Sequence, residues 1–135
     1  MTACVRAMIR SMTDKKTILV VDDDRDTVDV YRRVLEEKGF AVEPALDGAK
    51  GLELAKKGGY ALILLDLMMP NVDGLKVLTE LAASPPATPN GSVIVFTNLS
   101  HDPVIAQAMA LGAKACFVKS DITPDKLVEK ITAYL

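Results

Sequence analysis

Residues 61–70, Ala-Leu-Ile-Leu-Leu-Asp-Leu-Met-Met-Pro, contain an apolar run that ends in an aspartate. Apolar residues in an unbroken run that stops shortly before Pro70 are typical of a strand buried on both faces of a parallel sheet. Asp66 then lies at the carboxyl end of this strand, the edge where open α/β sheets bind ligands. A single aspartate here is better explained as a polar residue that closes a strand, so the case for a site depends on the ends of the other strands.

Short apolar segments alternate with segments whose apolar residues have helical spacing, and together they define the rest of the predicted fold. We expect strands at 17–21, 40–44, 61–65, 92–96 and 115–118, and helices at 25–38, 47–57, 73–81, from 100 or 102 to 111, and 123–135. Pro44 limits the second strand and favours an edge position. Regular alternation of strand and helix predicts an α/β fold, a doubly wound parallel sheet of five strands with helices on both faces.

Length and composition favour one globular domain. The chain has 135 residues, of which 50% are hydrophobic and 25% charged, with a formal net charge of -2. The absence of a basic excess gives no indication of direct nucleic-acid binding. Cys4 and Cys116 lie far apart and form no metal-ligand or disulfide pattern, which suits a reducing, cytoplasmic location.

The first residues differ from the remainder. No apolar run approaches the roughly 18 residues of a membrane span, and no sustained apolar segment indicates a signal peptide. We expect residues 1–15 to be a flexible N-terminal extension and 16–135 to be the domain; Met12 is an alternative start, and a short amphipathic helix before it is an alternative structure.

Polar residues follow four of the five predicted strands. Asp22, Asp23 and Asp24 follow the first strand and Asp66 the third, while Thr97 follows the fourth and Lys119 the fifth. Since parallel strands share one carboxyl edge, we expect these side chains to converge. Crowded carboxylates favour a hard divalent cation, and Mg²⁺ (or Mn²⁺) suits a site that keeps waters and accepts phosphate oxygens.

This set of side chains suits phosphoryl transfer to a carboxylate. An aspartate supplies the nucleophile, while a metal ion and a lysine neutralise the phosphoryl oxygens. Lysine can pair with Asp66 or with a phosphoryl oxygen, and the hydroxyl of Thr97 is a movable hydrogen-bond donor. The combination, with each member at its own strand end, is more specific than any single member.

The same residues resemble the receiver domain of two-component response regulators, from about Lys16 to Leu135, in the manner of a single-domain chemotaxis regulator. The resemblance implies a flavodoxin-like sheet of strand order 2-1-3-4-5. It also implies that Asp66 accepts the phosphoryl group, that Thr97 and Lys119 act as switch and catalytic residues, and that the metal ligands are Asp22, Asp23, Asp66 and the backbone carbonyl of Met68.

Three positions depart from the family pattern. The family has a proline with a cis peptide after the lysine, whereas this chain has Ser120, so we expect a trans bond here. The switch aromatic is replaced by Cys116, and Phe117 lies on the opposite side of the strand. Asn98 stands where the family commonly has a small residue, and we hypothesise that it restricts attacking water and lengthens the phosphorylated lifetime.

The resemblance implies a phosphorylated signalling module rather than a turnover enzyme, apart from limited Mg²⁺-dependent self-phosphorylation and autodephosphorylation. Expected partners are a histidine kinase or histidine phosphotransfer protein and a downstream protein, without direct nucleic-acid contact or membrane insertion, and the state is a monomer or weak dimer. A piece of a longer regulator and a stand-alone relay protein both fit the sequence.

Two other functional classes are alternatives. The first is a receiver-like binding module that is never phosphorylated, which the substitutions at Cys116 and Ser120 favour. The second is a phosphohydrolase with an aspartyl nucleophile after its first strand. The spacing of Asp22, Asp24 and Asp26 does not match that family's motif, and the chain is short for it.

Overall fold

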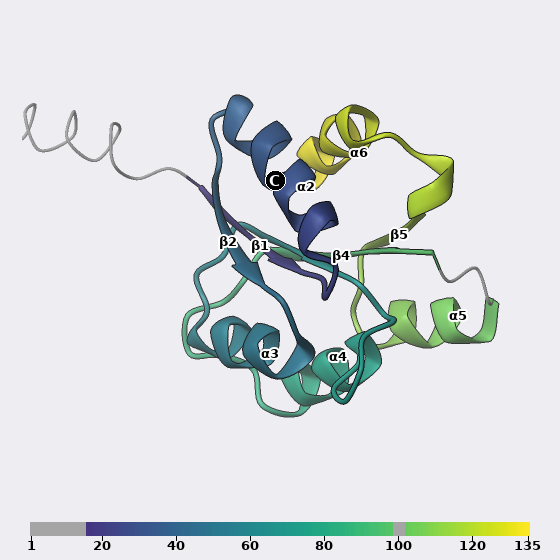
Figure 1. Ribbon diagram of the computed structural model, residues 1–135. Coiled ribbons are helices and arrows are strands. Elements are labelled where there is room, and N and C mark those ends of the chain that lie inside the picture. The colour runs from purple at the N-terminus through teal and green to yellow at the C-terminus, as the bar shows by residue number, and fades with distance from the viewer. Residues whose placement is uncertain (1–15, 99–101) are drawn as a thin grey trace, which may run out of the picture.

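The computed structural model describes residues 16–98 and 102–135 as one parallel sheet with helices on both faces (Figure 1). The strands are β1 (Thr17–Val21), β2 (Ala41–Ala45), β3 (Leu62–Leu65), β4 (Ser92–Thr97) and β5 (Ala115–Val118). They are ordered β2-β1-β3-β4-β5, and every neighbouring pair is parallel. The predicted fold class and strand order are confirmed. The expected extension over residues 1–15 lies outside the described residues.

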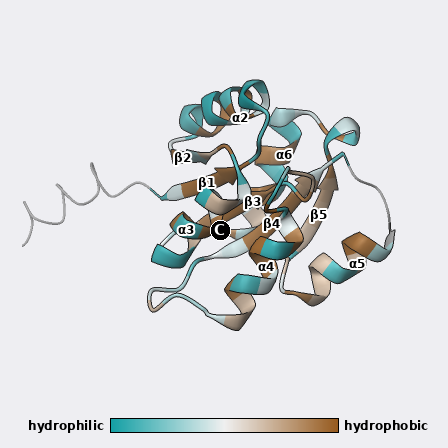
Figure 2. Ribbon diagram, turned by 60° about the horizontal axis from the view of Figure 1, so that its bottom comes forward, coloured by the Kyte–Doolittle hydropathy of each residue, from teal (hydrophilic) through white to brown (hydrophobic). Residues whose placement is uncertain are grey.

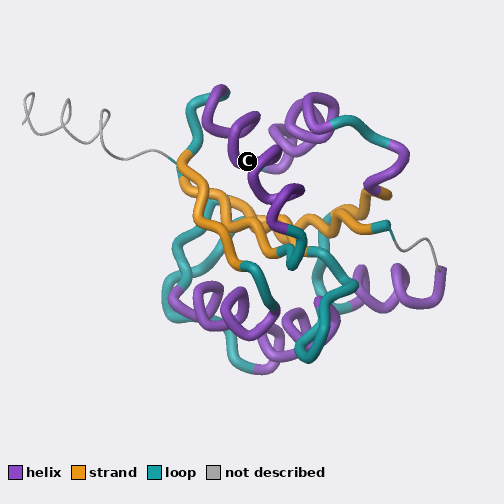
Figure 3. Tube along the Cα trace, viewed as in Figure 1, coloured by secondary structure: helices purple, strands orange, loops and turns teal. Residues whose placement is uncertain are grey.

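Helices form two layers, which the tube in Figure 3 separates above and below the orange strands. The helices are α2 (Arg25–Glu37), α3 (Gly48–Lys57), α4 (Gly74–Ala83), α5 (Asp102–Ala110) and α6 (Pro124–Ile131), with 3-10 turns η1 (Lys119–Asp121) and η2 (Thr132–Tyr134). Helices α2 and α6 cover one face of the sheet, and α3, α4 and α5 cover the other (Figure 1). Among residues 16–98 and 102–135, no helix has both the length and the apolar character required to span a membrane.

Strand alternation divides the core into two clusters. Val20, Leu64 and Phe96 point to the face of α2 and α6, whereas Val21 and Leu65 point to the face of α3, α4 and α5. Strands β1 and β3 are buried on both faces except for the half-buried Thr17, which explains their nearly continuous apolar sequences. In Figure 2 the central strands β1, β3 and β4 are accordingly brown, whereas α2 is largely teal.

Small differences from the predicted boundaries have local causes. Strand β2 spans residues 41–45 rather than 40–44, and it tolerates Pro44 because it is an edge strand with one hydrogen-bonded neighbour. The last helix ends at Ile131 and continues as a 3-10 turn, although the apolar spacing predicted a helix to Leu135. Helix α5 begins at Asp102, one of the two predicted starts; the other, Ser100, lies outside the described residues.

Candidate functional site

The carboxyl edge of the sheet holds the predicted site residues. Asp22 directly follows β1, Asp66 follows β3, Thr97 is the last residue of β4, and Lys119 follows β5. Because the five strands are parallel, these four positions share one edge. Of the side chains predicted to converge there, the structure brings Asp22, Asp23, Asp66 and Lys119 together.

Strand alternation also decides which side chains can meet. Asp22 and Asp66 are each two residues beyond an apolar residue of the α2 and α6 face, Val20 and Leu64. Lys119 likewise follows Phe117, which packs against the same cluster. The two carboxylates and the ammonium therefore come out on one side of the sheet, where α2 begins.

Lys119 joins the two buried carboxylates. Its Nζ donates to Oδ2 of Asp22 at 2.5 Å and to Oδ2 of Asp66 at 3.1 Å. Both carboxylates are almost inaccessible, with exposed fractions of 0% for Asp22 and 5% for Asp66. Charge-assisted bonds of this kind compensate the desolvation of buried ions. The pairing of Lys119 with Asp66 was predicted; its pairing with Asp22 was not.

Burial and ion pairing shift the pKa values of Asp22 and Lys119 in opposite directions. Burial raises the pKa of Asp22 above its ordinary value, although hydrogen bonds from Lys119 and from the Asp24 amide partly offset this. Burial on its own would lower the pKa of Lys119, but the hydrogen bond that Lys119 donates to Asp22 and the negative charge of Asp66 outweigh it, so the pKa of Lys119 is raised. Lys119 is therefore firmly cationic at neutral pH.

A third carboxylate completes an acidic cluster. Oxygen atoms of Asp22, Asp23 and Asp66 all lie within 4.8 Å of one another, and Asp23 is exposed. Two buried carboxylates with one exposed carboxylate at the rim provide the oxygen donors that Mg²⁺ prefers and leave room for water. The residues present thus fit a divalent cation.

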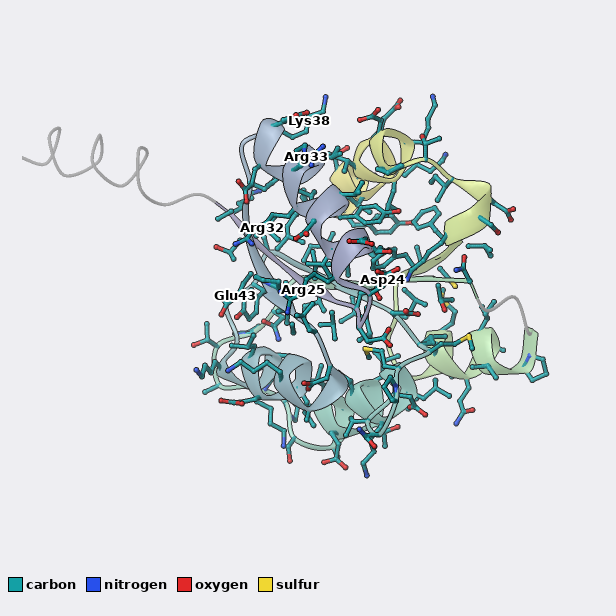
Figure 4. The ribbon with its side chains drawn as sticks, in the orientation of Figure 1. Asp24, Arg25, Arg32, Arg33, Lys38 and Glu43 are labelled. Atoms are coloured by element: carbon teal, nitrogen blue, oxygen red, sulfur yellow. The ribbon has the colours of Figure 1, made fainter. Side chains whose placement is uncertain are left out.

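Asp24 serves the helix rather than the cluster. Its Oδ1 accepts the Asp26 amide at 3.0 Å, and its Oδ2 accepts the Thr27 hydroxyl at 2.9 Å. Asp24 is thus the N-cap of α2, as its position in Figure 4 at the start of that helix indicates. The hydrogen bond from Thr27 lowers the pKa of Asp24. Of the three consecutive aspartates expected to converge with the other strand ends, Asp24 instead stabilises the start of α2.

The loop after Asp66 is held close to the site. Oδ1 of Asp66 accepts the Met68 amide at 3.1 Å. A Cβ on Gly74 would lie 2.4 Å from the backbone oxygen of Asp66, so only glycine lets α4 begin this close to it. Asp73 caps α4 by accepting the Lys76 amide at 2.9 Å, which confirms that Asp73 and Gly74 open this helix.

The three departures from the family pattern are visible around β4 and β5. All described peptide bonds are trans, including the bond from Lys119 to Ser120, as expected. Cys116 packs toward the α3–α5 face and Phe117 toward the opposite face, so Phe117 does not replace the missing aromatic at position 116. Thr97 is fully buried at the strand end, and Asn98 beside it is exposed.

Two aromatic residues near the site were not predicted. The Lys119 Nζ lies 4.9 Å from the centroid of the Phe96 ring. Tyr31 of α2 meets the same ring edge-on, with centroids 4.9 Å apart and an interplanar angle of 72°. Phe96 directly precedes Thr97, so its place in the strand was visible in the sequence. The contact of Phe96 with Lys119 was not visible in the sequence, because this contact depends on how the long lysine side chain crosses the sheet.

Comparison with known proteins identifies the family. The family model described as "Response regulator receiver domain" matches residues 18–132, nearly the whole chain. The chain belongs to this family. The matched range begins and ends within a few residues of the domain predicted from the sequence.

Relatives of this receiver domain include longer regulators. The "uncharacterized transcriptional regulatory protein YkoG" of Bacillus subtilis is 34% identical over 122 residues, which are 90% of this chain and 52% of that protein. The transcriptional regulatory protein DltR of Streptococcus agalactiae is 32% identical over 84% of this chain and 49% of its own length. The chain therefore spans about half the length of the curated relatives it matches.

Solved structures show the same fold. A receiver domain protein of Methanospirillum hungatei has a TM-score of 0.78 at 28% identity, covering 88% of this chain and 92% of that one. The response regulator TrrA of Thermotoga maritima, determined in complex with Mg²⁺ and BeF, has a TM-score of 0.75 at 32% identity, covering 89% and 99%. These likenesses support the receiver fold over the full described domain.

Proposed function

We propose that this receiver domain accepts a phosphoryl group on Asp66 in two-component signalling. The observation that carries the proposal is the buried Asp66 carboxylate, paired with Lys119 at 3.1 Å inside a cluster of three carboxylates. Core packing does not account for such a cluster, since burying carboxylates is costly even when they are paired. It is well suited to a ligand that brings a cation and phosphoryl oxygens.

The reaction is a displacement at phosphorus. A carboxylate oxygen of Asp66 forms a bond to phosphorus while the bond from phosphorus to the donor's imidazole nitrogen breaks, and the released nitrogen keeps the electron pair and takes a proton from solvent. The chain supplies orientation and charge. The Nζ of Lys119 already donates a hydrogen bond to Oδ2 of Asp66, so its charge is close to the oxygens of the incoming phosphoryl group. Thr97 provides a hydroxyl at the end of the neighbouring strand.

Asp22, Asp23 and Asp66 are proposed as the side chains that hold Mg²⁺, with the backbone carbonyl of Met68 as a further ligand. A bound Mg²⁺ would neutralise charge on the transferred phosphoryl group. That TrrA was determined with Mg²⁺ and BeF supports this assignment. Limited self-phosphorylation from a small phosphodonor and slow autodephosphorylation follow from the same site.

We further propose a histidine kinase or histidine phosphotransfer protein as donor and a downstream protein as receiver of the signal. The receiver itself is expected to be cytoplasmic, to act as a monomer or weak dimer and to make no direct nucleic-acid contact. Because the relatives are transcriptional regulatory proteins of about twice the matched length, output through a further domain and output through a separate partner are both consistent with this chain.

Intact-mass measurement with Mg²⁺ and acetyl phosphate tests the proposed function. The wild type should gain one phosphoryl group, and neither the Asp66→Asn variant nor the wild type in EDTA should do so. The gain should disappear after mild alkaline hydrolysis, because acyl phosphates are labile. If Mg²⁺ binds and neither acetyl phosphate nor a phosphorylated histidine donor adds mass, the domain would instead be a binding module.

A further inference from the structure

We propose that Phe96, supported by Tyr31, is a positioning residue that holds the Lys119 ammonium beside Asp66 throughout phosphoryl transfer. This inference rests on the proposed function and adds to it the means by which the lysine stays in place. The phosphoryl group and the metal engage the carboxylates, whereas the aromatic face remains available to the ammonium in every state of the site.

The sheet register explains why Phe96 meets the lysine. Thr97 of β4 is paired with Val118 of β5, so Lys119 begins one residue beyond the last pair. Its partners Asp66 and Asp22 follow β3 and β1, on the far side of β4. The lysine side chain must therefore cross β4 to reach them. Of the two β4 residues on that face, Ile94 and Phe96, Phe96 is the one nearer the carboxyl end where Lys119 crosses.

The geometry fits a cation–π contact. The ammonium lies 4.9 Å from the ring centroid, within the roughly 6 Å range of such contacts. Phe96 is fully buried and the lysine side chain is only 15% exposed, so little water screens the attraction. Desolvated contacts of this kind are at the strong end of their range.

Tyr31 fixes the ring from the side of α2. Its edge-to-face contact at 4.9 Å joins the first helix to β4 directly beneath the site. Tyr31 is itself buried, with an exposed fraction of 4%, so the pair of rings has little freedom to move. A fixed ring holds the ammonium of the flexible lysine side chain in one orientation. Misorientation of the ammonium would lower the rate of phosphoryl transfer.

The carboxylates cannot provide this constancy. Asp22 and Asp66 belong to the cluster that is proposed to hold the metal, and Asp66 loses its negative oxygen to the phosphoryl bond. Both current ion pairs of Lys119 are therefore altered during the reaction. Phe96 neither binds a metal nor titrates, so its contact with the ammonium is independent of those changes.

The test compares the initial rate of acetyl phosphate labelling at saturating Mg²⁺ in the wild type, in Phe96→Leu and in a protein carrying pentafluorophenylalanine at position 96. The fluorinated ring keeps nearly the same shape but loses the negative face that attracts a cation. Both changes should lower the rate about five- to thirtyfold while Mg²⁺ affinity stays unchanged. Phe40→Leu, the same substitution in the same core cluster but just before β2 at the opposite edge of the sheet, should leave the rate unchanged.

A double-mutant cycle separates positioning from a general effect on folding. In a Lys119→Ala background, Phe96→Leu should cause no further loss, because the residue acts only through the lysine. NMR of the protein without metal or phosphodonor should show the Lys119 side-chain protons shifted upfield by the ring, and the shift should vanish in Phe96→Leu.

Two results would overturn the inference while leaving the proposed function intact. One is a wild-type rate in the fluorinated protein. The other is a rate loss from Phe96→Leu that persists in the Lys119→Ala background. A wild type that takes up no phosphoryl group from any donor would instead overturn the proposed function itself.

Discussion

Asp23 and Asp24 are adjacent aspartates with different tasks. Asp23 lies at the rim of the acidic cluster, whereas Asp24 accepts two hydrogen bonds at the start of α2. Three consecutive aspartates in a sequence do not show which belongs to a metal site. The N-cap decides the division, because it occupies both carboxylate oxygens of Asp24.

This division predicts opposite results for two conservative substitutions. Asp23→Asn should raise the melting temperature slightly in EDTA, because it removes repulsion among carboxylates. The same change should reduce the stabilisation by Mg²⁺, which for the wild type is about 1.4 kcal/mol at ten times the dissociation constant. Asp24→Asn should keep Mg²⁺ affinity, because asparagine caps helices well. Equal Mg²⁺ affinity in Asp23→Asn and wild type would contradict the assignment.

We hypothesise that Asn98 lengthens the lifetime of the phosphorylated form. Its exposed side chain borders a cavity of about 350 Å³ that Lys119 and Tyr31 also line. A smaller residue here would open the approach of water to the acyl phosphate, so Asn98→Ala should shorten the half-life of phosphorylated protein after removal of the donor. The loss of phosphate is followed by intact mass against time. An unchanged half-life would refute the hypothesis.

At the scale of elements, close approaches between segments hold the edge of the sheet in place. A Cβ on Gly48 at the start of α3 would lie 1.8 Å from the backbone oxygen of Val72, in the loop between β3 and α4. That loop also carries Asn71, whose φ of 67° is left-handed. The start of α3 thus supports the loop that follows Asp66.

Gly48→Ala should therefore destabilise the domain by about 1–3 kcal/mol or more, as overpacking does. Gly39→Ala is a matched control, since Gly39 has a φ of +93° but no atom within 4 Å of an added Cβ. Gly39→Ala should lower the free energy of unfolding only by the cost of placing an alanine in a left-handed backbone conformation, about 1–2 kcal/mol. Urea unfolding measures both, and Gly48→Ala should also slow labelling of Asp66. Labelling at the wild-type rate would show that the loop does not need this contact.

The order and type of the elements could be predicted because each has a clear local signal. The strands at 17–21 and 115–118 match the sequence pattern to the residue, and Asp73 with Gly74 marks the start of α4 as predicted. The end of α6 could not be predicted from the apolar spacing, because an α-helix and a 3-10 turn bury similar faces over so short a stretch.

At the scale of the whole molecule, the parallel sheet turns distant positions into one site. The predicted residues Asp22, Asp66, Thr97 and Lys119 are widely separated in sequence and share one edge. That these positions share one edge follows from strand direction, so it could be predicted from the sequence. The contacts of Lys119 with Asp22 and with the Phe96 ring could not be predicted. They depend on how far the lysine side chain extends across β4, which no local sequence pattern encodes.

The ion pairs of Lys119 also link the site to the stability of the whole domain. Because the pKa of Lys119 is raised in the folded state, its contribution is complete below the ordinary lysine value of 10.5 and is lost as the pH rises through the higher folded value. In EDTA, the free energy of unfolding of the wild type should exceed that of Lys119→Met at neutral pH. This difference in the free energy of unfolding should shrink only above about pH 10.5, where the lysine of the unfolded chain begins to lose its proton. A difference that falls already between about pH 7 and 9 would contradict this pairing.

Chemical localisation of the phosphoryl group tests the central claim most directly. Borohydride reduces an aspartyl phosphate to homoserine, so the protein labelled with acetyl phosphate and Mg²⁺ is reduced, digested and sequenced by tandem mass spectrometry. We expect homoserine in place of Asp66 alone, and none in a sample labelled without Mg²⁺. Homoserine at Asp22 or Asp23 with Asp66 unmodified would contradict the assignment of Asp66 as the phosphoryl acceptor.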